Sequence, residues 1–173
     1  MRRTSYSLLA LATLAGAVGA SSATGGVDEK ASPIFGVKTP PGYRNWSLIS
    51  VAHEEGDLND LRAVLGNDIA VRAFREGKRS LPDGAIVARL AWRYVSSDEN
   101  NKAFGRAQSF VAGAGVNGIQ FMVKSSKKYA STGGWGFAQF NDGTPADEAK
   151  HRTCFPCHEA AKARDFVFTQ YSP

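Results

Sequence analysis

The amino-acid sequence predicts a mainly β (α+β) fold, in which a sheet is accompanied by a few short helices. Apolar and polar residues alternate with a period of two in several successive runs, which is typical of half-buried strands. Gly, Pro, Asn and Asp separate these runs at short intervals, as turns require. The length of 173 residues fits one folded domain. Together these observations argue against an all-helical bundle.

The N-terminus predicts export. Arg2 and Arg3 supply a positively charged start, and an apolar stretch of Leu, Ala and Gly follows over residues 8–20, which is too short to span a bilayer. Small residues then allow cleavage after Ala20 or Ala23. We therefore expect a periplasmic or secreted mature protein. The chain divides into a signal peptide over 1–23, a loose N-terminal arm rich in Gly, Pro and Ser over 24–41, and a folded domain over 42–173.

Charge and hydropathy exclude two kinds of partner. The net charge of +5 falls to about +3 when the two arginines of the signal peptide are removed, which is too slight to indicate nucleic-acid binding. No later stretch is apolar enough over its length to cross a membrane. Hydrophobic residues make up 43% and charged residues 21%, as in ordinary soluble domains. We expect neither nucleic acid nor, after signal cleavage, a membrane as a partner.

The first half of the domain predicts two strands and a helix. Residues 43–54 alternate as a strand, and residues 61–65 predict a short second strand. Asn67 or Asp68 can cap a helix that extends to about residue 76, where Gly77 is a good terminator. The turn signal "LPDG" follows this helix.

The second half predicts further strands and two helical turns. The alternation predicts strands over 85–95, 103–111, 118–124, 135–140 and 165–171. The polar "SSDENN" predicts a turn after the first of these, and the Gly-rich "AGAGVNG" separates the second from the third. Helical turns are expected over residues 145–150 and at the cysteine-containing segment that follows.

The segment "RTCFPCHEAAKARDF" contains both cysteines of the chain and one of its three histidines. Cys154, Cys157 and His158 form a C-x-x-C-H motif, whose two thiols can bond the two vinyl groups of one porphyrin while the adjacent imidazole faces the iron. The motif therefore predicts one covalently bound haem c with its iron. Cys154 and Cys157 are the expected attachment residues, and His158 is the expected proximal iron ligand.

Two other interpretations of the motif remain open. An exported chain favours disulfides, so Cys154 and Cys157 could pair, although a redox disulfide is expected near a βαβ unit early in a chain. A zinc site needs about four ligands. His151 and His158 could join the two thiolates, but their spacing matches no common zinc pattern.

Five blocks of sequence occur in order over about residues 40–172: "PPGYRNW", "REGKRSLPDGAIVARL", "FMVKSSKKY", "GGWGFAQF" and "CFPCHEAAKARDFVFTQY". With these blocks the chain resembles the cytochrome P460 family, which includes the β-sheet cytochromes c′ (cytochrome c′-β). The resemblance implies a mainly antiparallel β-sheet with a few short helices and the haem at one end of the sheet. It also implies a homodimer.

The resemblance further implies two branches of function. P460 enzymes oxidise hydroxylamine and carry an additional lysine–haem bond, whereas cytochromes c′-β bind nitric oxide at a five-coordinate haem under an apolar cap. Arg89 stands where the resemblance places the cross-linking lysine, and arginine stays protonated and cannot act as an amine nucleophile. Lys78, the nearest other lysine, is expected to be a solvated charge at a helix end. Arg89 is expected either to contact the haem, at a propionate or in the distal pocket, or to be a solvated charge.

No second axial ligand is evident. Met122 is expected to pack in the sheet, His53 to lie at a strand end on the surface, and His151 to be solvated. The iron is therefore expected to keep an open position. An apolar lid over it could come from phenylalanines on the strands that flank the Gly-rich segment: Phe104, Phe110 and Phe121.

Three functions follow from these expectations. The first is binding of a small gaseous or nitrogenous ligand such as nitric oxide, the second is oxidoreductase activity on hydroxylamine or another nitrogen compound, and the third is periplasmic electron transfer with a redox partner protein. The open iron position argues against a carrier. Arg89 argues against the hydroxylamine enzyme, so ligand binding is the preferred interpretation. The sequence identifies no catalytic residue.

Overall fold

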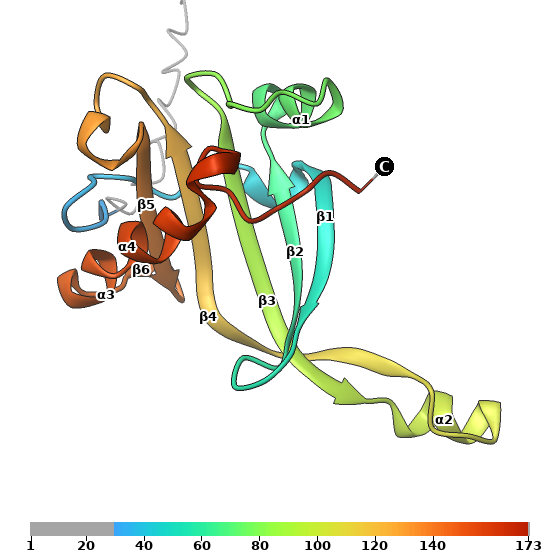
Figure 1. Cartoon of the computed structure of the whole chain (residues 1–173). Helices are drawn as coiled ribbons and strands as arrows, with labels where there is room; N and C mark the ends of the chain where they lie inside the picture. Colours follow the sequence, from blue (N-terminus) through green and yellow to red (C-terminus); the bar gives the residue numbers. More distant parts are fainter. Residues whose placement is uncertain (1–29, 173) are drawn as a thin grey trace, which may run out of the picture.

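A computed structural model describes residues 30–172 of the chain as one antiparallel six-stranded sheet with short helices (Figure 1). Each strand pairs with its neighbour in the sequence, so the sheet is a simple meander. The strands are β1 (Ser47–Glu54), β2 (Asp60–Gly66), β3 (Ile86–Ser96), β4 (Phe110–Lys124), β5 (Trp135–Asn141) and β6 (Thr144–Pro145). The predicted mainly β fold is confirmed. The predicted signal peptide lies outside the described residues.

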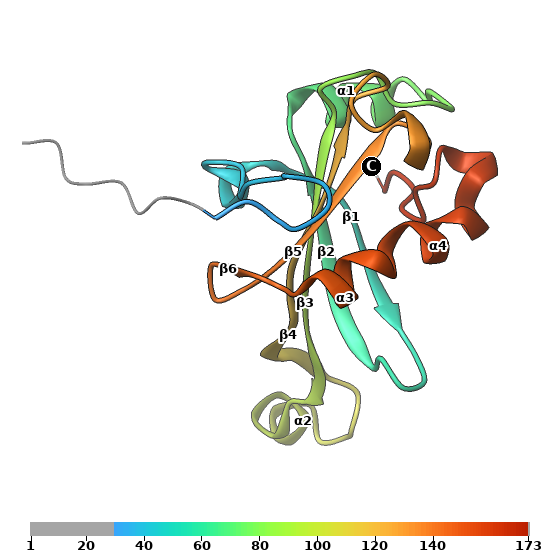
Figure 2. The same cartoon turned by 90° about the vertical axis from the view of Figure 1, so that its left-hand side faces the viewer.

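The register of the strands defines two faces of the sheet. Val64, Arg89, Gln120 and Gln139 lie directly opposite one another on β2 to β5 and therefore share one face. The helices and coil after β6 lie over this side, so we call it the C-terminal face; Figure 2 shows these segments on one side of the sheet. We call the other side the opposite face.

Helix α1 (Asp68–Arg75) forms as the sequence predicts. The Asn67 side chain caps it by accepting a hydrogen bond from the Ala70 amide at 3.0 Å, because the first amides of a helix have no partner within the helix. Its apolar side is buried against the sheet, beside β1, β2 and β3. The remaining helices are η1 (Tyr43–Asn45), α2 (Asp98–Phe104), η2 (Ala130–Thr132), α3 (Glu148–Arg152), α4 (Cys154–His158) and η3 (Glu159–Arg164).

The predicted turn after β3 and the predicted strand over 103–111 are both wrong. Ser97 caps α2 by accepting a hydrogen bond from Asn100, and Gly105, at φ 69°, ends the helix. The Gly-rich segment, expected to separate two strands, instead belongs to the single long strand β4. Glycines tolerate the register shifts that bend this strand against β3. The ends of β3 and β4 with α2 form a hairpin arm that projects from the body (Figure 1).

The predicted strand over 165–171 is also wrong. Asp165 and Phe166 have left-handed backbone angles, φ 53° and 63°, which interrupt an extended chain. The coil that follows crosses the C-terminal face, and the Ser172 amide donates a hydrogen bond to the carbonyl of Ile49 on β1. The C-terminal segment therefore covers the sheet instead of extending it.

The described part of the predicted loose arm, residues 30–41, is packed. Phe35 is buried, and its ring lies 5.4 Å from Phe137 and 6.2 Å from Tyr129. The Tyr129 hydroxyl also donates to the Phe35 carbonyl at 3.1 Å. Burial of these aromatic groups outweighs the flexibility that Gly, Pro and Ser suggest. Within residues 30–172, no helix has the length and hydropathy to span a membrane.

Candidate functional site

The site is built around α4, which contains the C-x-x-C-H motif. Cys157 and His158 follow Cys154 by three and four residues, so each of them is a neighbour of Cys154 on the surface of the helix. Both cysteines are free thiols in this structure. Burial raises the pKa of the Cys154 thiol, whereas Cys157 is exposed. Two thiols and an imidazole thus share a single helix face, as attachment to one planar group requires.

His158 has one ring nitrogen engaged and one available. Its Nδ1 lies 2.7 Å from the backbone carbonyl oxygen of Phe166, and since a carbonyl only accepts, Nδ1 must carry the proton. No hydrogen bond from the described residues reaches Nε2. Burial lowers the pKa of His158, and the Phe166 bond opposes this effect. The neutral form with a free Nε2 lone pair is the form in which histidine ligates iron.

Aromatic rings surround this histidine. The His158 ring lies 4.9 Å from Phe137 on β5 and 5.3 Å from Phe168 in the C-terminal coil. Phe137 also neighbours Phe155 of the motif, and Phe155 neighbours Phe166. The histidine is therefore held on the C-terminal face by apolar contacts as well as by its hydrogen bond.

His151, on the preceding helix α3, is fully buried, which contradicts the expectation that it is solvated. Its Nδ1 donates to the Asp147 carbonyl at 2.7 Å, and its Nε2 accepts the Gln139 amide proton at 3.1 Å. Both ring nitrogens are therefore used: Nδ1 binds the capping residue of α3 itself, and Nε2 joins α3 to β5. Among residues 30–172, no group of three or more His, Cys, Asp or Glu side chains is placed to hold a metal ion, so the zinc interpretation has no support.

Arg89 is neither free nor solvated. It donates to Asp60 Oδ2 at 2.7 Å and to Gln120 Oε1 at 3.1 Å. Asp60 is 0% exposed and also receives two hydrogen bonds from Arg62. Burial, with the Arg62 charge second, lowers the pKa of Arg89, and Asp60 opposes this; the guanidinium remains charged. The expectation of a solvated charge is wrong.

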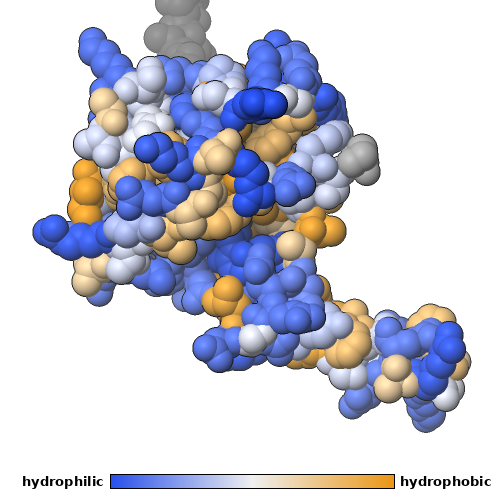
Figure 3. Space-filling view, in the orientation of Figure 1, coloured by the Kyte–Doolittle hydropathy of each residue, from blue (hydrophilic) through white to orange (hydrophobic). Residues whose placement is uncertain are grey.

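The Arg89 cluster belongs to a longer polar row on the C-terminal face. Gln120 donates to Gln139 at 2.9 Å, and Gln139 donates to Asn141 at 3.2 Å. Met122 and Phe137 form the adjacent row of the same face, and Phe137 contacts His158. Figure 3 shows hydrophilic side chains on this side below the apolar band of the C-terminal segments. Gln139 of the polar row is thus two residues along β5 from Phe137, the residue that packs against His158.

The three phenylalanines expected to form a lid do not lie beside the motif. Phe104 is 60% exposed on α2, and Phe110 stacks on Tyr94 in the hairpin arm. Phe121 is buried on the opposite face, where its ring meets Tyr43 at 5.1 Å. The predicted strand was wrong for Phe104, which lies in α2. Phe110 does lie in a strand, but at the far end of β4 in the hairpin arm, and the register turns Phe121 away from the motif.

The two residues considered as a sixth ligand behave as expected. His53 is exposed near the end of β1 on the opposite face, where it stacks on Tyr94 and bonds Asn59. Met122 is buried in the core of the sheet. Neither side chain is free at the motif.

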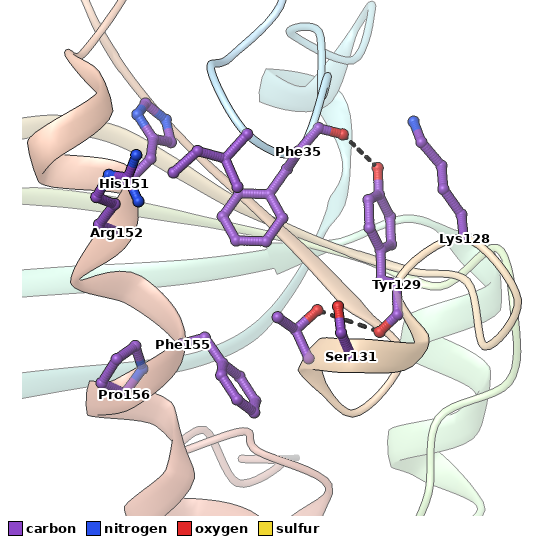
Figure 4. Close-up of a pocket in the computed structure, with 10 residues that line it drawn as sticks. Phe35, Lys128, Tyr129, Ser131, His151, Arg152, Phe155 and Pro156 are labelled. Carbon is purple, nitrogen blue, oxygen red and sulfur yellow. Dashed lines mark hydrogen bonds between the residues drawn. The ribbon is translucent and has the colours of Figure 1, made fainter.

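A cleft of about 420 Å³ lies between the motif helix, which contributes Phe155 and Pro156, and the segments around Phe35 and Tyr129. The rings of Phe35 and Phe155 point into it, with Lys128 and Arg152 at its margin (Figure 4). A hollow of about 520 Å³ lies on the opposite face beside Trp92. Neither Cys154, Cys157 nor His158 lines either space. Of these three residues, Cys157 is exposed, whereas Cys154 and His158 are half-buried.

Sequence reasoning missed several residues that shape this site. Asp60, Lys124 and Asp165 are charged groups buried by partners distant in the sequence. Their burial leaves no local pattern, because each lies next to ordinary polar residues. The Phe166 carbonyl was missed because the segment was assigned to a strand.

A comparison with models of protein families gives a match. The family model described as Cytochrome P460 matches residues 40–169. This range includes the whole sheet, the polar row, the motif and the carbonyl that holds His158. A search of curated proteins finds no match.

Proposed function

Because the chain belongs to the cytochrome P460 family and is a haem protein of that type, we propose that it carries one covalent haem c in an exported mature protein. Cys154 and Cys157 would form the two thioether bonds, and His158 would ligate the iron. The observation that carries this proposal is the His158 ring, whose Nδ1 proton is donated to Phe166 while Nε2 stays available. The donor set fits the group, because two free thiols share its helix face.

A bound haem would supply an iron atom able to bind a diatomic ligand. We propose nitric oxide as the ligand class, at an iron with an open second axial position. His53 lies on the wrong face of the sheet, and Met122 is packed within it, which supports an open position. The apolar lid no longer supports the proposal, since Phe104, Phe110 and Phe121 lie elsewhere.

The second candidate is an oxidoreductase that acts on hydroxylamine or another nitrogen compound. The polar row of Arg89, Gln120 and Gln139 favours it, because these groups could bind a polar substrate above the C-terminal face. The surroundings of Lys78 and Arg89 argue against a P460-type bond between a lysine and the haem. Lys78 is exposed and paired with Glu76 at 2.9 Å, and the Arg89 guanidinium is paired with Asp60. We therefore keep ligand binding as the preferred function.

The test has two parts. Haem staining after denaturing electrophoresis and acid-acetone extraction should show a band that persists, since thioether bonds survive this treatment. Loss of the band would exclude covalent attachment. Titration of the ferrous protein with nitric oxide should then give a saturable spectral change with little hydroxylamine turnover. Rapid turnover with an artificial acceptor would establish the enzyme instead, and failure to bind nitric oxide or carbon monoxide would favour an electron carrier with a redox partner.

The expected homodimer stays a prediction. The opposite face and the hairpin arm expose apolar side chains that a second copy could cover: Leu48, Val51, Val95, Phe104, Phe110 and Val111. Sedimentation of the mature protein should give twice the monomer mass. A monomer at all concentrations would contradict this.

A further inference from the structure

We infer that the buried ion pair between Lys124 and Asp165 is a positioning device for His158. It fixes the turn whose carbonyl, at Phe166, orients the imidazole. The inference rests on the proposed function, in which His158 ligates the haem iron. Lys124 and Asp165 are positioning residues, since neither contacts His158 directly.

The pair itself is short and shielded from water. Lys124 Nζ lies 2.6 Å from Asp165 Oδ1, and the two side chains are only 7% and 9% exposed. The ammonium also donates to the Gly133 carbonyl at 3.2 Å and lies 4.9 Å from the centre of the Trp135 ring. A buried charge held by several partners has little freedom to move, because each alternative position would leave it unpaired.

Asp165 connects the turn to β4, to the loop before β3 and to β5. Its Oδ1 binds Lys124 at the end of β4, and its Oδ2 accepts the Leu81 amide from the loop before β3 at 2.9 Å. Its backbone carbonyl accepts the Trp135 indole proton from β5 at 2.8 Å. These contacts fix both the side chain and the backbone of the residue directly before Phe166.

The backbone needs this support. Asp165 and Phe166 are consecutive non-glycine residues at positive φ, 53° and 63°. Such conformations are strained for residues that carry a Cβ, so they persist only where surrounding contacts impose them. The Phe166 ring packs so closely over Gly133 that a Cβ at this position would clash with the ring. The turn is therefore held at its side chains as well, and its carbonyl lies 2.7 Å from His158 Nδ1.

The fixed Phe166 carbonyl affects the strength of His158 as an iron ligand. A histidine that donates Nδ1–H to a fixed carbonyl is more basic at Nε2 and has a fixed ring plane. If the ion pair is lost, the turn loosens and that hydrogen bond weakens. His158 then becomes a weaker iron ligand, although the haem stays attached through both cysteines.

The experiment uses the full-length haem-loaded protein and four variants: Lys124→Met, Asp165→Asn, the double variant, and Lys78→Met as a control that breaks an exposed pair. The readouts are the iron–histidine stretching band of the ferrous protein, by resonance Raman spectroscopy, and the reduction potential. We expect the first three variants to shift the band to lower frequency and raise the potential. We expect the control to match the wild type.

The double variant keeps the test decisive if either single variant folds poorly, because removing both charges leaves no unpaired buried ion. A double variant with the wild-type band and potential would overturn the inference, as would single variants that lose only thermal stability. Failure of the proposed function is a separate result, in which His158→Ala retains the wild-type band and another residue holds the iron.

Discussion

Two histidines on consecutive helices, His151 on α3 and His158 on α4, have the same side chain but different bonding. His151 is 0% exposed and uses both ring nitrogens within the protein. His158 is partly buried and uses only Nδ1. A ring with both nitrogens occupied fastens one element to another, whereas a ring with one fixed nitrogen presents the other to a partner. The number of hydrogen bonds to the ring, not proximity to the motif, separates the structural histidine from the proposed iron ligand.

The largest effect should follow from His158→Ala. We expect loss of normal axial ligation in both oxidation states, because no other described imidazole is free on this face of α4. Absorption and electron paramagnetic resonance spectra of the haem-loaded protein measure it. Added imidazole should restore part of the wild-type spectrum by occupying the vacated space. A variant spectrum identical to the wild type would reverse the roles of the two histidines.

His151→Ala should give the opposite result. The change removes the side-chain partner of the Gln139 amide and one of the two hydrogen bonds to the Asp147 carbonyl, which still accepts the backbone amide of residue 151. It also opens a cavity, so the free energy of unfolding should fall by about 3 kcal/mol. The haem spectrum should remain that of the wild type. Chemical denaturation measures the loss, and His151→Gln, which keeps one polar partner, should cost less. An altered axial spectrum with unchanged stability would show that His151 belongs to the iron site.

The pH dependence of the apoprotein sharpens the comparison further. Burial lowers the pKa of His158 in the folded state below its ordinary value of 6.5. Between these two pKa values the unfolded chain binds more protons, so this residue destabilises the fold as pH falls below about 6.5. From about pH 7 to about pH 5 the wild type should therefore lose more stability than His158→Gln. Equal losses in the two proteins would show that the folded-state pKa of His158 is not lowered.

The smallest effect concerns the cysteines of the same helix. Cys157 is exposed, whereas Cys154 is half-buried and burial raises the pKa of its thiol. The thiolate is the reactive form, so iodoacetamide should modify Cys157 before Cys154 in the apoprotein. Peptide mass spectrometry over a time course measures the order. Faster modification of Cys154 would indicate that α4 opens readily without haem.

Local patterns in the sequence were sufficient for much of the fold. The eleven-residue strand β3 and the buried strand β5 were predicted, as was helix α1 with a cap at Asn67 or Asp68, because alternation and capping act between near neighbours. The C-x-x-C-H motif is equally local, since its spacing alone puts the thiols and His158 on one side of a helical turn. The glycines of β4 misled the assignment, because a glycine can mark either a break or a bend within a strand.

The sequence by itself therefore determined the mainly β fold, the family and the residues expected to hold the haem. Only the tertiary structure decided which polar groups are buried. Asp60 meets Arg89 across 29 residues, Lys124 meets Asp165 across 41, and Phe121 turns away from the motif through its register on β4. These outcomes depend on which strands and loops pack together, and a buried charge is stable only when a distant partner reaches it. A pattern of near neighbours in the sequence carries no information about such a distant partner, so the burial of these charges could be seen only in the folded structure.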